Sequence, residues 1–280
     1  MKSLFAGITL MTMCSAAFAA DEDSLGLPGD QLDLKAVLHL FSQSSDLESF
    51  EKNLNDETKG INNLDLDANG KVDYIMVEDI MDSTTHAIVL RVATSETEFQ
   101  DVAVIEVEKT GAENAQAQIV GDDELYGADY IVEASSENDD KEAADFRAPV
   151  IIVNVWYWPC VRFVYAPMYR PWRSPWRWGR YPNYWKPWRP VPYYVYHPRV
   201  RVYHVHYRRV TVHRTVVAHR VYYPHHHRSA VVRQHYKTAP AHRNAPAHRS
   251  AQPKKQVRQQ KVKQSQPRST PAKGGGRGRR

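Results

Sequence analysis

Apolar residues between positions 32 and 54 recur every three or four residues, which is the spacing of helices that bury one face. Ser45 and Glu48 match the S-x-x-E capping box that opens a helix, so a second helix is expected to begin there. The sequence therefore predicts two short helices near the start of the chain. Their expected core positions are Leu32, Leu34, Val37, Leu38, Leu40 and Phe41 in the first helix and Leu47, Phe50 and Leu54 in the second.

After Gly60 the apolar pattern changes to short β-branched runs separated by turn residues. Runs at this spacing are typical of strands joined by hairpins. We expect an antiparallel meander with the two helices over one face, which is a small α+β domain. The predicted strands are residues 72–80, 86–94, 102–109, 115–120 and 130–134.

The second half of the chain has a different pattern. Residues 150–158 are β-branched and aromatic, which predicts a strand that docks on the sheet. Residues 165–198 interleave Trp and Tyr with Arg and Pro, so extended or polyproline II geometry is expected there and a regular helix is not. Residues 199–223 alternate with a period of two, which predicts one or two strands.

Charge divides the chain into two unlike parts. All 32 Asp and Glu lie between positions 21 and 145, together with only seven Lys and Arg, which is a formal charge of −25. Residues 146–280 contain no acidic residue and hold 29 of the 37 Lys and Arg and 11 of the 13 His. Burying aromatic side chains among uncompensated arginines is costly, so this division argues against one compact globule.

These patterns predict four regions after the leader. The expected organisation is an acidic α+β domain over 20–134, a polar linker over 135–148, a basic Trp/Tyr/Arg/Pro-rich segment over 149–223, and a basic tail over 224–280. The tail is rich in Gln, Lys, Arg, Pro and Ala and lacks the apolar residues of a core, which predicts disorder.

The first nineteen residues have the features of a secretory signal peptide. Lys2 supplies a basic start, Leu4 to Met13 an apolar run, and Ala17-Phe18-Ala19 a small-x-small cleavage site. Cleavage after Ala19 predicts export to the periplasm, cell envelope or extracellular space. Cys160 would then have no partner for an internal disulfide, which leaves a free thiol or an intermolecular bridge. The apolar run over 150–164 is shorter than the roughly 20 residues of a spanning helix.

One loop carries recognisable metal chemistry. Counting from Asp65, oxygen-bearing side chains stand at positions 1, 3, 5 and 9, a glycine stands at position 6, and a backbone carbonyl is available at position 7. Position 12, where an EF-hand has a glutamate, is Met76. The loop resembles the strand-flanked calcium loops of integrin-type propeller repeats. That resemblance implies Ca²⁺ held by Asp65, Asp67, Asn69 and Asp73, with the Lys71 carbonyl as a further ligand. The alternative is a plain hairpin turn at Asn69-Gly70, capped by the aspartates.

The Trp/Arg-rich stretch has the composition of a polyanion-binding surface. Arginine stacks on tryptophan, and its guanidinium group binds phosphate or carboxylate in a bidentate manner. The stretch resembles cationic membrane-active peptides. The alternative is an extended stalk in which the aromatic rings pack on one another. The predicted polyanion-binding residues are Arg170, Trp172, Arg173, Trp176, Arg177, Trp178, Arg180, Trp185, Lys186, Trp188 and Arg189.

Histidines in the basic half offer a second kind of metal chemistry. His204 and His206 have same-face spacing in a strand, and His225, His226 and His227 form a tract. Imidazoles suit Zn²⁺, Ni²⁺ or Cu²⁺. Because no Cys, Asp or Glu accompanies them in the sequence, the alternative is that they act as titratable extra charge near pH 6.

Four segments together resemble an uncharacterised family of exported bacterial proteins. The resemblance covers most of the chain before the tail. It implies a bacterial envelope or secreted setting and no activity, so no catalytic residue carries over. The segments are NNLDLDANGKVDYI, SETEFQDVAVIEVEKTG, QIVGDDELYGADYIVE and VNVWYWPCVRFVYAPMYRPWRSPWRWGRYP.

The sequence contains no G-x-S-x-G or H-E-x-x-H motif and no phosphate-cradling glycine loop after a predicted strand. We therefore expect a non-enzymatic exported protein without a small-molecule substrate. Its predicted partners are anionic lipid headgroups, phosphorylated glycans, acidic polysaccharide or extracellular DNA. Two alternatives stand beside this one. The first is a matrix protein that forms homo-oligomers through its oppositely charged halves, and the second is a periplasmic His-rich metal-handling protein.

Overall fold

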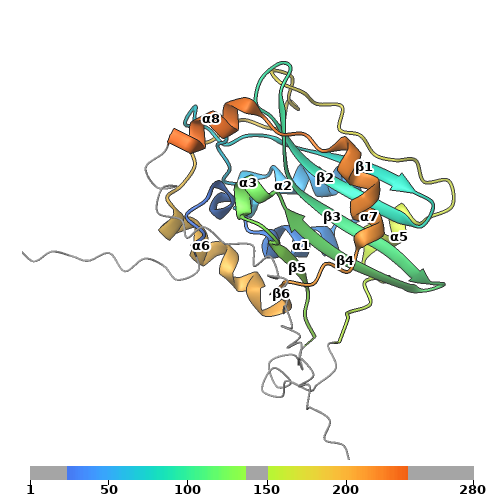
Figure 1. Ribbon diagram of the computed structural model, residues 1–280. Helices are drawn as coiled ribbons and strands as arrows, with labels where there is room; N and C mark the ends of the chain where they lie inside the picture. The colour runs from blue at the N-terminus through green and yellow to red at the C-terminus, as the bar shows by residue number, and fades with distance from the viewer. Residues whose placement is uncertain (1–23, 137–150, 239–280) are drawn as a thin grey trace, which may run out of the picture. The chain divides into compact units, whose positions relative to one another are not determined.

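The acidic half forms an antiparallel meander preceded by two helices, as the apolar pattern predicts. The computed structural model describes residues 24–136 and 151–238 (Figure 1). Strands β1 to β5 each pair with the next in the sequence, so the α+β class is confirmed. The strands are β1 (Ile75–Asp82), β2 (Thr85–Ala93), β3 (Phe99–Gly111), β4 (Asn114–Gly121), β5 (Ile131–Ala134) and, from the basic half, β6 (Tyr207–Val210).

Three predicted features lie outside the described residues. They are the signal peptide over 1–19, the linker residues 137–148 and the tail residues 239–280.

The two expected helices are α1 (Leu34–Gln43) and α2 (Leu47–Leu54). The capping box of α2 is formed by Asp46 and Ser49, one residue later than predicted from Ser45 and Glu48. The aspartate carboxylate accepts from the Ser49 amide at 2.7 Å, and the Ser49 hydroxyl accepts from the Asp46 amide at 3.2 Å. A helix that begins at Leu47 turns its leucines toward the core.

The remaining helical elements mostly belong to the basic half. The α-helices are α3 (Asp123–Tyr126), α5 (Pro159–Val164), α6 (Tyr193–Val200), α7 (Val216–Tyr222) and α8 (Ala230–Thr238), and the 3-10 turns are η1 (Pro28–Gln31), η2 (Glu57–Lys59), η3 (Arg201–His206) and η4 (Tyr223–His225). None of the helices within residues 24–136 and 151–238 has the length and apolar character needed to cross a membrane.

Alternation along the strands gives the sheet two covered faces. Ile88 and Ile105 point into the main core, where they pack with residues of α1, α2, α5 and α6. Val89 and Val104 point to the other face, where they pack with Tyr222 of α7. Helix α7 contacts β1, β2 and β3 on that second face (Figure 1). The basic half therefore supplies cover for this second face over β1 to β3.

The basic half also pairs with both edges of the meander. On one edge, β6 pairs antiparallel with β5. On the other edge, the amide of Asp79 in β1 donates to the carbonyl of Trp172 at 2.8 Å, and the amide of Ser174 donates to the carbonyl of Val77 at 2.9 Å. Unpaired strand edges promote association with other chains. The basic half covers both edges of the acidic meander, and β6 becomes the outermost strand on one side.

Residues 151–158 dock on the sheet as predicted, but they do not form the predicted strand. The Val155 amide donates to the Ala115 carbonyl at 3.0 Å, and the Asn154 side chain accepts from the Ala115 amide at 3.1 Å. Further hydrogen bonds join Asn154 to Glu113 before β4 and the Ile151 carbonyl to Arg208 of β6. Pro159 then opens α5, because proline is well suited to the first turn of a helix.

The expected strands over 199–223 are mostly wrong, since only β6 is a strand and the other elements are α6, η3 and α7. Tyr196 and Val200 are buried on one side of α6, and Ala218 and Tyr222 on one side of α7. These pairs are four residues apart, so the segment fits helical spacing as well as alternation. Residues 165–192 contain no helix, as predicted, but α6 begins within the stretch 165–198 where none was expected.

The predicted disorder of the tail is wrong for its described part. Residues 224–238 contain most of η4 and the helix α8, and Val232 is buried in the main core.

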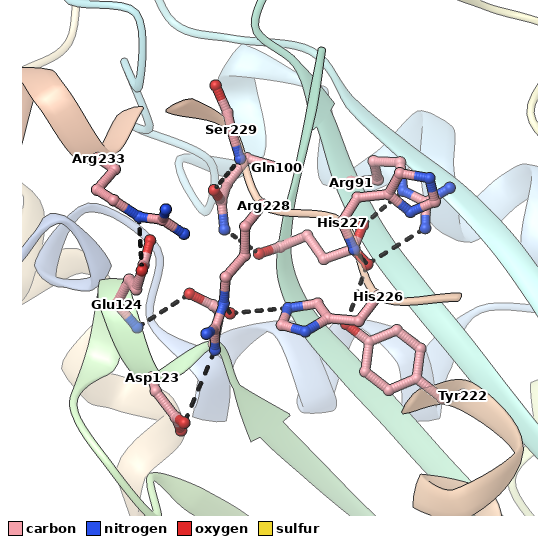
Figure 2. Close-up of polar contacts among 12 residues, drawn as sticks. Arg91, Gln100, Asp123, Glu124, Tyr222, His226, His227, Arg228, Ser229 and Arg233 are labelled. Carbon is pink, nitrogen blue, oxygen red and sulfur yellow. Dashed lines mark hydrogen bonds and ion pairs between the residues drawn. The ribbon is translucent and has the colours of Figure 1, made fainter. Parts of the chain in front are cut away.

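The described residues of the two halves belong to one folded unit, so the argument from charge against a single globule is wrong. The two halves can fold together because buried carboxylates of the acidic half pair with arginines of the basic half. Arg208 and Arg214 lie 2.9 and 2.5 Å from the two oxygens of Glu133. Figure 2 shows another part of this contact, in which Arg228 and Arg233 reach acidic side chains around α3. Because each of these arginines has a carboxylate beside it, the free-energy penalty of burying an unpaired charge does not arise.

Candidate metal and anion sites

The loop over residues 65–73 gathers three of its predicted ligands. Carboxylate oxygens of Asp65, Asp67 and Asp73 all lie within 4.8 Å of one another. The loop is held by its own polar contacts: Asp65 accepts from the amides of Asn69 at 3.0 Å and Gly70 at 2.9 Å, and Asp67 accepts from the Asn69 amide at 3.1 Å. Three carboxylates at this spacing are arranged as a hard cation requires.

Asn69 takes part in the loop's own hydrogen bonds, and Lys71 does so through its amide, not through the carbonyl that was the predicted ligand. The Asn69 side-chain oxygen accepts from the Lys71 amide at 2.9 Å, and the Asn69 side-chain nitrogen donates to Asp67 at 2.8 Å. Asp65 and Asp67 also cap the turn at Asn69-Gly70, as the alternative interpretation predicts, although this turn does not connect β1 to β2.

Burial makes the charge of Asp73 costly. Its side chain is 7% exposed, and desolvation together with the nearby carboxylates of Asp67 and Asp65 raises its pKa to about 8. Within the described residues its carboxylate accepts a hydrogen bond from the Leu66 amide at 2.6 Å, which lowers the pKa and so opposes the shift. A bound cation would remove both the repulsion and the cost of ionisation.

We call residues 170–189 the cationic segment. Its predicted polyanion-binding side chains are of two kinds, cations and tryptophans, and they differ in exposure. All the cations of this set are exposed, whereas the tryptophans are buried or half-buried. Trp176, Trp178, Trp185 and Trp188 pack together on Tyr74 and Met76. The exposed cations are Arg170, Arg173, Arg177, Arg180, Lys186 and Arg189.

The expected stacking of arginine on tryptophan does not occur in the cationic segment. Cation–π contacts in the described residues instead place Lys52 over Tyr184, Lys109 over Trp156 and Tyr165, and Arg209 over Tyr130. The tryptophans therefore anchor the segment to the sheet and leave its cations to meet a ligand.

The backbones of two of these residues are paired with one another. Arg177 and Arg180 exchange both backbone hydrogen bonds, at 3.1 and 2.8 Å, around the two-residue turn Trp178-Gly179. Gly179 has φ 67°, which such a turn favours. Residues paired in this way carry their side chains on the same side, where like charges repel. Within the described residues, neither guanidinium group has an acidic partner.

The five histidines predicted as metal ligands are not brought together. His204 pairs with Asp33 at 2.7 Å, and His206 stacks on His39 with centroids 6.1 Å apart. Residues 201–206 form the 3-10 turn η3 and not a strand, so the same-face argument fails. In the tract, His226 pairs with Asp122 at 2.9 Å (Figure 2).

The other two tract histidines make local contacts. The ring of His227 lies 2.7 Å from the carbonyl of His225, and the same carbonyl accepts from Arg91 at 3.2 Å. Each histidine of the tract therefore contacts a different group, and within the described residues the three do not form a metal-ligand cluster.

A different group was missed from sequence. Glu106 on β3 lies between His213 and His219, with oxygen–nitrogen distances of 2.5 and 2.8 Å. The two imidazoles are separated from Glu106 by more than 100 residues in the chain, so no spacing motif could indicate the contact. Only the five-residue interval between the histidines was visible in the sequence.

The hydrogen bonds of this group shift the pKa values of Glu106 and His213. The Glu106 side chain is fully buried, and although burial alone would raise its pKa, hydrogen bonds from His213 and His219 hold that pKa below its usual value. The hydrogen bond to Glu106 raises the pKa of His213. Thr215 adds a further donor at 2.6 Å. All three ionisable side chains line a pocket of about 210 Å³.

Comparison with protein-family models, curated proteins and solved structures finds no match to this chain.

Proposed function

We propose that the chain is an exported, non-enzymatic protein that binds anionic polymers of the cell envelope or extracellular matrix through the cationic segment. The observation that carries this proposal is the Arg177–Arg180 pair. Two adjacent guanidinium groups without an acidic partner in the described residues repel one another, and a phosphate or carboxylate group placed between them relieves that repulsion.

The surroundings of the pair support the same ligand class. Six cations of the cationic segment are exposed, and of these Arg173 is paired with Glu78. Because the half-buried tryptophans fix the backbone, less conformational entropy is lost when an anion binds. Repeated weak contacts of this kind suit a polymer with many phosphate or carboxylate groups, and their strength falls as salt is added.

The first experiment measures binding of the full chain to phosphatidylglycerol vesicles, with phosphatidylcholine vesicles as the neutral reference. A basic residue near an anionic surface contributes about 1 kcal/mol, so Arg177→Gln with Arg180→Gln should weaken binding about 30-fold at low salt. A DNA duplex and an acidic polysaccharide serve as parallel probes of which polymer binds most tightly.

The matched control is Arg162→Gln with Arg220→Gln, which removes two exposed cations outside the cationic segment. Equal weakening by both double variants would show that net charge alone governs binding, and the segment would lose its proposed role.

Calcium is the second part of the proposal. We infer that Asp65, Asp67 and Asp73 hold Ca²⁺ with help from Asn69 and the Lys71 carbonyl, because the three carboxylates lie within 4.8 Å of one another and accept hydrogen bonds from neutral amides. Ca²⁺ prefers six to eight oxygen ligands at about 2.3 to 2.6 Å, and a single loop supplies most of them here. The ion would stabilise the acidic sheet next to β1.

Thermal unfolding of the full chain tests this part. Calcium should raise the melting temperature of the natural chain relative to chelator and leave Asp65→Asn with Asp73→Asn unchanged. Glu57→Gln with Glu96→Gln removes two exposed carboxylates elsewhere and should retain the rise. A calcium-dependent rise that survives in the loop variant rules the site out.

Self-association is tested in the same samples by sedimentation. The acid–base contacts of the described residues are made within one chain, for example between Arg214 and Glu133, which leaves fewer opposite charges to join separate copies. Oligomers that dissociate in salt and bind none of the polyanions would favour a matrix protein over a polyanion-binding one.

A further inference from the structure

The group formed by Glu106, His213 and His219 differs from the other acid–histidine contacts of the fold. His86 with Asp79, His204 with Asp33 and His226 with Asp122 are contacts in which one carboxylate meets one imidazole. Here one buried carboxylate meets two imidazoles, whose ring centroids are 4.8 Å apart. A second imidazole adds little to neutralising a single carboxylate, so pairing of charge does not explain its place.

The donor set is that of a transition-metal site. Two imidazole nitrogens and one carboxylate oxygen, all within 4.8 Å of one another, make a two-histidine, one-carboxylate group. Ligands about 2.0 Å from a tetrahedral ion lie roughly 3.3 Å apart, so small side-chain rotations bring these donors into place. Imidazole selects Zn²⁺, Ni²⁺ or Cu²⁺ over Ca²⁺, which distinguishes this site chemically from the loop over 65–73.

The surroundings resemble those of a metal site that retains an open position. Glu106 is fully buried, while the side chains of His213 and His219 are 26% and 35% exposed and border the pocket. The hydroxyl of Thr215 donates to Glu106 and orients its carboxylate, as partners behind metal ligands commonly do. Three protein ligands leave a fourth position on the pocket side for water or an anion.

We propose that Glu106, His213 and His219 form a binding site for a divalent transition-metal ion, with Zn²⁺ the best match to the donors. Metal binding displaces the protons that the imidazoles share with Glu106 and releases them to solvent. The site joins Glu106 of β3 to His213, which precedes α7, and to His219 within α7, so the ion would also hold the basic half against the sheet.

Titration of the full chain with Zn²⁺, in calcium sufficient to saturate the acidic loop, tests the site. His213→Ala with His219→Ala should raise the dissociation constant of one Zn²⁺ per chain by about 100-fold or more. His225→Ala with His227→Ala removes two histidines of the tract and is expected to leave that constant unchanged. Equal affinity in the natural chain and the His213/His219 variant overturns the proposal.

A measurement on the unaltered chain covers the case in which the variant fails to fold. Diethylpyrocarbonate modifies exposed imidazoles, and peptide mass spectrometry locates each modified histidine. One equivalent of Zn²⁺ should protect His213 and His219 and leave His225 and His227 reactive. Protection confined to the tract, or no protection at all, contradicts the site.

Discussion

The backbone amide of Asp79 donates a hydrogen bond of 2.8 Å to the carbonyl oxygen of Trp172. The donor stands on the edge of the acidic sheet, and the acceptor belongs to the cationic segment. Through this contact the segment closes the edge of β1, packs its tryptophans inward and leaves its cations exposed. The cationic segment thus both covers the β1 edge of the sheet and presents the proposed binding surface.

Glu51 should be essential to this arrangement. It is 2% exposed, and Glu51→Ala would leave its buried donors without an acceptor, which is expected to lower the free energy of unfolding by about 3 kcal/mol. Urea unfolding measures the change. Glu48→Ala, an exposed substitution on the same helix, should cost under about 0.5 kcal/mol. The donors to Glu51 are the Tyr74 hydroxyl, the Val77 amide, the Trp172 indole and the Ser174 hydroxyl.

Glu133 should join the halves at the opposite edge. Arg208 and Arg214 converge on its carboxylate, whose side chain is 7% exposed, so Glu133→Gln leaves two partly buried guanidinium groups without their counter-charge. We expect a loss of about 2 kcal/mol in urea unfolding. Glu113→Gln, at an exposed position, should change the value by under about 0.5 kcal/mol. Equal effects of the two substitutions would remove Glu133 from this role.

Asp73 should make the chain's stability depend on pH when divalent cations are chelated. Its pKa is raised from 3.8 to about 8, mainly by burial, so between these values the folded chain holds a proton that the unfolded chain releases. The free energy of unfolding should therefore fall as pH rises through this window, and Ca²⁺ should restore it at the alkaline end. Asp73→Asn removes this contribution in urea unfolding in chelator at pH 5 and pH 8. An identical slope in the variant contradicts the assignment.

Cys160 should be chemically inert in the folded chain. It is fully buried, and burial raises the pKa of its thiol well above the usual value, so very little reactive thiolate forms. Iodoacetamide is expected to label Cys160 only after addition of urea, as read by mass spectrometry of its peptide. Labelling of the native chain at the unfolded rate would show that the surrounding core opens readily.

Helices α1 and α2 and strands β1 to β5 could be predicted because their pattern is local, whereas the short elements η1, η2 and α3 were not predicted. Helices α1 and α2 each bury one stripe, and β1 to β5 are separated by turn residues, so short-range spacing is sufficient. The elements of 199–223 could not be predicted in this way. Ala218 and Tyr222 satisfy helical spacing inside an alternating pattern, and contact of α7 with the sheet decides between helix and strand.

The two candidate metal sites differ in the same way, because one is local in sequence and the other is formed by long-range contacts. Asp65, Asp67 and Asp73 lie within nine residues, so the sequence alone brings their carboxylates near one another. Glu106 meets His213 and His219 only because α7 and the segment before it lie across β3. A long-range contact of this kind has no signal in spacing.

The sequence by itself determined the charge of each half, the acidic meander with its two helices, and the loop of three aspartates, since composition and short-range periodicity are properties of the chain. The tertiary structure decided which cations are used internally. Arg214 forms an ion pair with buried Glu133, whereas Arg177 and Arg180 are exposed to solvent. These arginines are alike as residues, and they differ only in whether folding places a carboxylate beside them, which depends on contacts between distant parts of the chain.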